Sequence, residues 1–342
     1  MDLNNGTVKW QSPSNIALVK YWGKRGKQLP QNPSVSFTLS NCRTETAVTY
    51  EPSDAFGLDF RFDGKEAPEF QSKIQDFLTA HLECFPSLNR LHLQIDSHNT
   101  FPHSSGIASS ASSMSALVMC LLDIERMARE EQDIDMKQAS SLSRLASGSA
   151  CRSLFPKMAL WGSTEALKGS SDEYAVSLEQ EIHPVFKTYR DSILIVSDAK
   201  KAVSSRAGHA LMDNNPYAET RYTVARKNIK DLLTALRMGD LERFIQITES
   251  EAMQLHALMM CSEPSFILMK PNTLRIINNL HEFRKETDIP VCFTLDAGPN
   301  VHVLYPDQHA EMVERFIMDE LEQYCFGGRW IPDQVGEGAS RL

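Results

Sequence analysis

Small and hydroxyl-bearing side chains crowd residues 102–113, where the sequence reads PHSSGIASSASS. Side chains this small let backbone N–H groups approach an anion, and an apolar helical pattern follows directly. Phosphate is the natural ligand of such a helix N-terminus. The segment lacks the Gly-Lys-Ser/Thr of a Walker A loop and the spacing of the dinucleotide-binding glycines. A serine-rich loop that only caps a closely packed helix is the alternative.

Residues 12–24, SPSNIALVKYWGK, place an amide, two ammonium groups and a phenol on and just beyond one strand candidate. These groups belong to Asn15, Lys20, Tyr21 and Lys24. Lysine ammonium groups can hold phosphate or carboxylate oxygens as mobile point charges. An edge strand with solvated lysines has the same pattern, so the segment alone leaves both interpretations open.

Two later segments carry polar groups at suggestive places. Residues 147–152, SGSACR, offer two hydroxyls and the guanidinium of Arg152 beside a helix end, which suits carboxylate and phosphate oxygens together. A capped helix with a surface arginine would have the same sequence pattern. Asp296 opens the turn-like run DAGPN between two strand candidates, where a turn-forming aspartate is the simple explanation.

Other kinds of chemistry find no support in the sequence. The histidines show no metalloprotease spacing, and no residue is assigned as a metal ligand. There is no Gly-x-Ser-x-Gly elbow and no Cys-His pattern at Cys151, so covalent catalysis is not indicated.

The elements that must position these groups change in character along the chain. Strand patterns are predicted over residues 15–21, 34–39, 45–50, 58–62, 91–95, 192–196, 291–295 and 301–305. Helical patterns follow Gly106 and Asp135 and are predicted over residues 217–237, 241–258 and 273–284. Because the C-terminal half is richer in helix, we place a soft domain boundary near residue 187, giving units 1–187 and 188–342.

Composition narrows the class further. The chain has 342 residues, 42% of them hydrophobic, which suits one large domain or two modest ones. A formal net charge of −9 argues against a broad nucleic-acid-binding surface. The N-terminus does not resemble a secretory signal, and the longest apolar stretch, residues 116–122, is too short to cross a bilayer. Seven scattered cysteines fit a reducing cytoplasm.

Taken in order, these segments resemble the diphosphomevalonate decarboxylase family of the GHMP small-molecule kinase superfamily. The resemblance rests on residues 15–25, 29–36, 106–111, 147–153 and 296–300, and it is weaker between about 50 and 90. It implies an α+β GHMP kinase fold, with an N-terminal domain of the ribosomal-protein-S5 domain-2-like type and a C-terminal α/β domain. The active site would lie in the cleft between them, and the protein would be a homodimer.

The resemblance also implies roles for individual residues. The ATP phosphates would be contacted by Gly106, Ala108, Ser109 and Ser110. The substrate carboxylate would be held by Asn15 and Arg152, with Lys20 nearby. Its diphosphate or neighbouring oxygens would be bound by Tyr21, Lys24, Ser147, Ser149 and either Ser204 or Ser205. Asp296 would face the tertiary C3 hydroxyl, which makes Asp296, Lys20 and Arg152 the catalytic residues.

The implied reaction is the ATP-dependent decarboxylation of mevalonate 5-diphosphate to isopentenyl diphosphate, with Mg²⁺, in isoprenoid biosynthesis by the mevalonate pathway. A relative that phosphorylates mevalonate or its monophosphate, with or without decarboxylation, is the nearest alternative. A nucleotide-binding homologue without turnover is a second alternative, of a different class.

Overall fold

The computed structural model describes residues 4–102, 107–199 and 205–342. Its strands are β1 (Gly6–Val19), β2 (Lys24–Arg25), β3 (Leu29–Pro30), β4 (Ser34–Pro52), β5 (Gly57–Phe62), β6 (Lys65–Glu66), β7 (Leu91–Asn99), β8 (Met158–Trp161), β9 (Ala175–Ser177), β10 (Arg190–Leu194), β11 (Cys292–Thr294), β12 (Val301–Tyr305), β13 (Trp330–Gln334) and β14 (Ser340–Arg341). Its α-helices are α1 (Pro68–His81), α2 (Ser109–Ala128), α3 (Met136–Ala146), α4 (Ser205–Ala210), α5 (Ala218–Met238), α6 (Leu241–Met260), α7 (Pro271–Thr287) and α8 (Ala310–Phe316).

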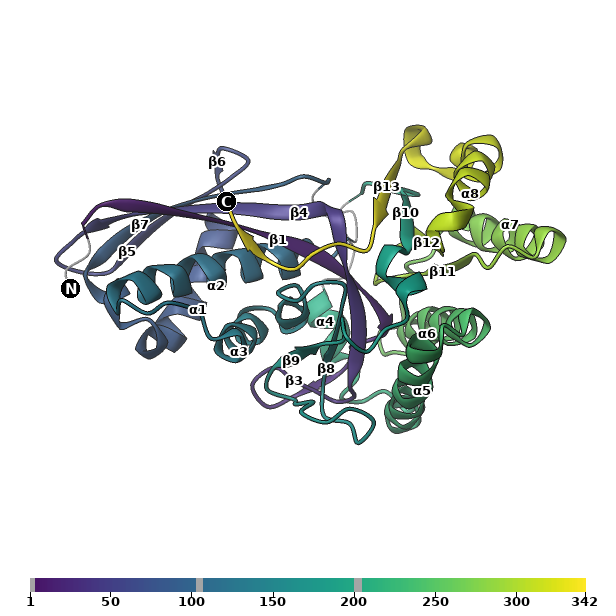
Figure 1. Ribbon diagram of the computed structural model, residues 1–342, viewed down its shortest axis with the longest axis horizontal. Helices are drawn as coiled ribbons and strands as arrows, with labels where there is room; N and C mark the ends of the chain where they lie inside the picture. The colour runs from purple at the N-terminus through teal and green to yellow at the C-terminus, as the bar shows by residue number, and fades with distance from the viewer. Residues whose placement is uncertain (1–3, 103–106, 200–204) are drawn as a thin grey trace.

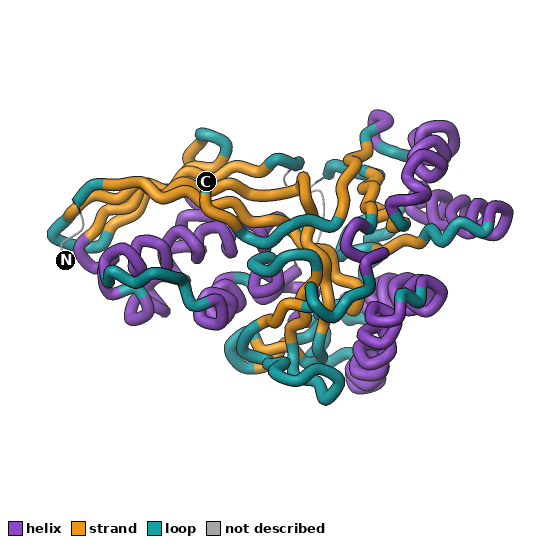
Figure 2. Tube along the Cα trace, in the orientation of Figure 1, coloured by secondary structure: helices purple, strands orange, loops and turns teal. Residues whose placement is uncertain are grey.

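The molecule is elongated, with a long sheet and helices α1, α2 and α3 at one end and helices α5 to α8 at the other (Figure 1). The long sheet has the order β14-β1-β4-β7-β5-β6, and β8 and β9 continue it from the first half of β4. A smaller antiparallel sheet has the order β11-β12-β10-β13. Figure 2 shows the helices of the first end gathered along one side of the long sheet. This is the mixed α+β architecture that the sequence predicts.

Strand β4 differs from the prediction, because the segments expected as two strands form a single strand of 19 residues. Its register against β1 jumps from Pro13↔Arg43 to Asn15↔Thr38, so the residues between bulge out of the ladder. The buried carboxylate of Asp333 accepts the backbone N–H groups of Ser40, Asn41 and Cys42 at 2.7–2.8 Å. This acceptor is distant in sequence, so local pattern gave no sign that the strand continues.

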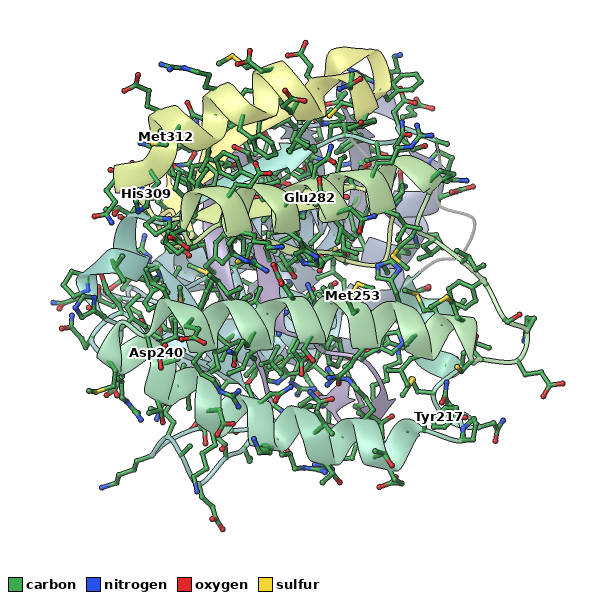
Figure 3. All side chains as sticks on the ribbon, turned by 90° about the vertical axis from the view of Figure 1, so that its right-hand side faces the viewer. Tyr217, Asp240, Met253, Glu282, His309 and Met312 are labelled. Atoms are coloured by element: carbon green, nitrogen blue, oxygen red, sulfur yellow. The ribbon has the colours of Figure 1, made fainter. Side chains whose placement is uncertain are left out.

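The three predicted helices of the second half are confirmed as α5, α6 and α7, and the first two form an antiparallel pair. Helix α5 ends at Gly239, which has the left-handed φ of 72° that ends many helices. Asp240 then caps α6 by accepting the N–H of Arg243 at 3.0 Å. A connection of two residues forces α5 and α6 to pack side by side, as Figure 3 shows from the outer face.

A continuous apolar core joins the two ends of the molecule. It contains Ile16 and Phe37 of the long sheet, Ile193 of the smaller sheet, Ile229 of α5 and Phe244 of α6, all buried. The chain also returns at its C-terminus, where β14 pairs with β1 at Trp10↔Arg341 and the last residues lie on the long sheet (Figure 1). The boundary near residue 187 stays a prediction. In the part of the chain that the structure describes, no helix is long and apolar enough to span a membrane.

Gly162 provides a test of the packing where β8 ends. Its φ is +111°, and a Cβ atom added there would lie 2.4 Å from the Cα atom of Pro33. Gly169 also has a positive φ, of +84°, but open space around the added atom. We therefore expect Gly162→Ala to lower the free energy of unfolding by about 1–3 kcal/mol more than Gly169→Ala does, measured by urea denaturation. Equal losses would mean that the backbone at Pro33 yields without cost.

Candidate active site

The ends of two strands from different sheets meet at an ion pair. Lys20 directly follows β1, and Asp296 follows β11 after one residue. The Nζ atom of Lys20 lies 3.0 Å from Oδ1 of Asp296. The lysine side chain is 2% exposed and the aspartate 23%, so the carboxylate is the accessible member of the pair. Two residues predicted as catalytic, 276 positions apart, are therefore in direct contact.

The buried position of Lys20 decides between the two interpretations of its segment. Strand β1 ends at Val19, and Lys20 is not a solvated residue of an edge strand. Lys24 is half buried, and its ammonium donates to Oε1 of Gln28 at 3.0 Å. The two lysines thus have different described partners, Asp296 for Lys20 and Gln28 for Lys24.

Asn15 and Arg152 form a second buried group. The amide of Asn15 donates to the backbone oxygen of Ser149 at 3.1 Å and to the hydroxyl of Ser153 at 2.8 Å. Its Oδ1 atom accepts from Nε of Arg152 at 3.3 Å. The Nη1 atom of Arg152 donates to the hydroxyl of Ser34. Because two edges of the guanidinium are held by partners, its plane has one orientation, which is what bidentate recognition of a carboxylate needs.

Electrostatics links these groups. Burial lowers the pKa of Arg152 from its ordinary value, and the negative charge on Asp296 acts in the opposite direction. Burial also raises the pKa of Tyr21 well above its usual value, so the phenol stays protonated. The site thus combines cationic groups with one accessible carboxylate and a phenol that can donate.

Aromatic rings surround Tyr21. Its ring lies 4.6 Å from that of Trp161 and 4.4 Å from that of His209, centre to centre. Gly148, in the predicted segment 147–152, leaves room for this ring, because a Cβ atom there would lie 2.9 Å from the phenol oxygen. The glycine is therefore required by the close approach of Tyr21, which brings segments 12–24 and 147–152 together.

The serine-rich segment reaches the same region through α2. The helix begins at Ser109, after Ala108 in the left-handed conformation with φ 43°, and among the described residues no side chain caps it. The hydroxyl oxygens of Ser110 and Ser147 are 3.4 Å apart. The first amide groups of a 20-residue helix thus lie beside segment 147–152, and they suit phosphate oxygens.

Some predicted site residues lie outside this geometry. Gly106 and Ser204 lie outside the described residues. Ser205 begins α4, but its side chain lies outside the description. Ser149 meets the site through its backbone oxygen, which accepts from Asn15. In the described ranges, no three His, Cys, Asp or Glu side chains come together as a group that could hold a metal ion.

Sequence reasoning missed several contacts of the predicted residues. The hydroxyl of Ser34 accepts a hydrogen bond from Arg152. The indole ring of Trp161 faces the guanidinium of Arg152, 6.0 Å away. His209 accepts the N–H of Gly23 at 3.0 Å through Nδ1. These residues lie in strands and a short helix, and their local sequence carries no signal of these contacts.

Two family models match the chain. The diphosphomevalonate decarboxylase-like N-terminal domain matches residues 12–175, and the mevalonate 5-diphosphate decarboxylase C-terminal domain matches residues 192–328. The diphosphomevalonate decarboxylase of Saccharomyces cerevisiae is 32% identical over 91% of this chain and 81% of its own length.

Solved structures agree over nearly the whole length. The mevalonate diphosphate decarboxylase of Staphylococcus aureus has a TM-score of 0.86 at 27% identity, covering 99% of this chain and 98% of its own. A structure of MDDEF in complex with MVAPP, AMPPCP and magnesium has a TM-score of 0.83 at 28% identity, covering 99% of both chains.

Fold and site together define an ATP-dependent enzyme with the GHMP kinase fold. Within that class, the chain belongs to the diphosphomevalonate decarboxylase family. The resemblance, fold class and enzyme class predicted from the sequence are confirmed, whereas the individual residue roles stay predictions.

The buried histidines make stability depend on pH. Burial lowers the pKa of His209 to about 3 and that of His256 to about 4, from an ordinary 6.5. The unfolded chain therefore binds protons more readily than the folded chain. The stability that neutral His209 and His256 contribute is fully present above pH 6.5 and is lost as the pH decreases toward 4. Each histidine contributes a slope of up to about 1.4 kcal/mol per pH unit. We expect His209→Asn to flatten the slope by about that amount in urea titrations between pH 7.5 and 4.5.

A matched control separates titration from packing. Met212→Ala removes buried apolar contacts just after α4 without removing a titrating group. This variant should be less stable at every pH with the wild-type slope. A wild-type slope in His209→Asn would show that His209 takes up its proton equally in both states.

Proposed function

We propose that this chain converts mevalonate 5-diphosphate and ATP to isopentenyl diphosphate, carbon dioxide, ADP and phosphate, with the Lys20–Asp296 pair at the reacting centre. The direct contact of these two residues at 3.0 Å carries the proposal. Family membership supplies the reaction, and the magnesium and AMPPCP of the related complex support ATP with Mg²⁺ as its partner.

The reaction needs phosphoryl transfer before decarboxylation. A tertiary alcohol is a poor leaving group, so the γ-phosphoryl group of ATP first moves to the C3 oxygen. Such transfer depends on in-line positioning and on neutralised charge. The backbone amides at the start of α2 would hold phosphate oxygens, and the hydroxyls of Ser109 and Ser110 would contact the same phosphates. Mg²⁺ would neutralise charge between the phosphates.

Asp296 would orient the C3 hydroxyl and accept its proton. Its carboxylate is the accessible member of the pair, and the contact with the Lys20 ammonium holds it in place. Once the C3 phosphate leaves, positive character develops at that carbon, and loss of carbon dioxide supplies the electrons of the alkene.

Arg152 and Asn15 would fix the carboxylate that is lost. The held plane of the guanidinium can align the breaking carbon–carbon bond with the C3–oxygen bond. Decarboxylation disperses the carboxylate charge, so a grip that is too strong on the bound substrate would slow that step. Tyr21, Lys24, Ser147 and Ser149 would surround the diphosphate, together with Ser204 or Ser205.

Localisation and assembly are further parts of the proposal. All seven cysteines are unpaired, which supports a reducing cytoplasm. A homodimer rests on the resemblance alone, and sedimentation analysis of the purified chain measures it directly.

The experiment that tests the function is a matrix of substrates. Mevalonate, its 5-phosphate and its 5-diphosphate are each incubated with Mg-ATP, and ADP and carbon dioxide are measured separately. Equal amounts of both products from the 5-diphosphate alone support the proposal. ADP without carbon dioxide would identify a kinase, and ATP binding without ADP release from any substrate would identify a homologue without turnover.

Asp296→Asn tests the assigned base. The amide keeps the shape of the side chain but removes the proton acceptor and its charge, so we expect turnover to fall roughly 10²-fold or more. Steady-state ADP release measures it, with circular dichroism to establish that the variant is folded. Near-normal turnover of the folded variant would rule out the assigned role.

Arg152→Lys tests the recognition of the carboxylate. The charge remains but the planar fork is lost, so activity on the natural substrate should fall by about 10-fold to 10³-fold. Phosphorylation of an analogue that lacks the carboxylate is the control, and it should not respond to the substitution. An equal loss with the analogue would assign Arg152 to the nucleotide or to the fold.

A further inference from the structure

Helix α6 contacts the backbone of both members of the Lys20–Asp296 pair. We propose that α6 is the positioning frame of the active site, with Glu251 fixing the backbone of Lys20 and His256 fixing that of Asp296. The inference rests on the proposed roles of Lys20 and Asp296, and it adds two positioning residues that do not touch the reacting atoms.

Glu251 is a fully buried carboxylate with four hydrogen-bond donors around it. Its Oε2 atom accepts the backbone N–H of Lys20 at 2.9 Å and also a bond from Nη2 of Arg221. Its Oε1 atom accepts from Nη1 of Arg221 at 2.8 Å and from the amide of Asn228 at 2.7 Å. Both donor side chains come from α5. The carboxylate has little freedom to move, and the Lys20 backbone is fixed with it.

The carbonyl of Lys20 is fixed as well. It accepts from the amide of Asn32 at 3.1 Å, and Nη2 of Arg221 approaches it at 3.5 Å. With both backbone polar groups of Lys20 engaged, the residue is held in place directly after the end of β1. The ammonium position then depends only on the side-chain rotamer.

His256 makes the matching contact on the other side. Its Nε2 atom donates to the backbone oxygen of Asp296 at 3.1 Å, and the ring is 1% exposed. A carbonyl oxygen only accepts, so Nε2 must carry the proton of a neutral imidazole. The contact fixes the first residue of the turn 296–300, whose carboxylate faces Lys20.

The placement of α6 explains how one helix can contact the residues that follow both β1 and β11. It packs against β1 and also against β11, which belong to different sheets. Glu251 and His256 are five residues apart, about 140° around the helix, and the buried residues Ala252 and Leu255 lie between them on that face. Met253 lies on the outer face, turned away from the sheets (Figure 3).

A shared frame has a kinetic signature. Loss of either contact would let one member of the pair shift by a fraction of an ångström, and misplacement of about 1 Å can lower a rate by 10²-fold. The nucleotide phosphates are assigned to α2. Neither the Glu251 contact nor the His256 contact involves that helix. A positioning role therefore predicts a lower kcat with an unchanged dissociation constant for an ATP analogue.

The principal test compares two substitutions of His256. His256→Leu removes the donor, whereas His256→Gln keeps an N–H group at a similar reach. We expect kcat to fall by about 10-fold to 10²-fold in His256→Leu and to stay within about threefold in His256→Gln. Binding of the ATP analogue AMPPCP, measured by calorimetry, should not change. Equal losses in both variants, or weaker AMPPCP binding that matches the loss, would overturn the proposal.

The contact between Glu251 and the Lys20 backbone must be tested with a conservative substitution. Glu251→Gln would leave Arg221 buried without its counter-charge, and unfolding would obscure the result. Glu251→Asp keeps the charge but withdraws the oxygens by one methylene group, and it should lower kcat by about 10-fold. Ile247→Ala is the matched control, because it loosens the buried face of α6 without touching either contact. This control should be less stable yet keep kcat within about twofold; a loss as large as that of Glu251→Asp would overturn the proposal.

A double substitution separates this inference from the proposed function. His256→Leu should cost little further rate in an Asp296→Asn background, because its effect passes through that carboxylate. The same fold-loss in both backgrounds would overturn the positioning role. If Asp296→Asn alone keeps full activity, the proposed function of Asp296 fails first, and the inference fails with it.

Discussion

The contact between the Lys20 ammonium and the Asp296 carboxylate is the constraint on which the rest of the structure depends. The two residues follow strands of different sheets, so neither sheet alone can set their separation of 3.0 Å. A lysine that is 2% exposed is stable only with a partner for its charge. The arrangement of the two sheets must therefore be fixed to a fraction of an ångström.

Three features fix that arrangement. The apolar core runs without interruption from β1 and β4 to α5, α6 and β10. The C-terminal segment returns to the long sheet, where Asp333 fastens the bulge of β4 and β14 pairs with β1. The buried Arg221–Glu251 pair ties α5 and α6 to the end of β1. Apolar burial supplies most of the stability, and the polar contacts select one arrangement among several of similar energy.

The same burial shapes the electrostatics of the site. Tyr21, His209 and His256 are neutral because desolvation disfavours their charged forms. The charges that remain belong to groups with defined partners, such as Arg152 with Asn15 and Ser34. A preorganised set of charges in a poorly solvated place needs little rearrangement during a reaction that develops charge.

The sequence alone determined the α+β class, most helices and strands, the family, and the residue types able to hold phosphate and carboxylate, because these follow from local pattern and from the order of motifs. Tertiary structure decided what is distant in sequence. It showed that Lys20 is buried against Asp296 and that β4 continues through its bulge because Asp333 accepts hydrogen bonds from the bulge. It also showed that Glu251 and His256 contact the backbone of Lys20 and of Asp296. A buried charge on an amphipathic helix interrupts the apolar pattern of the sequence. The sequence does not show which residue is its partner, because only folding brings the two together.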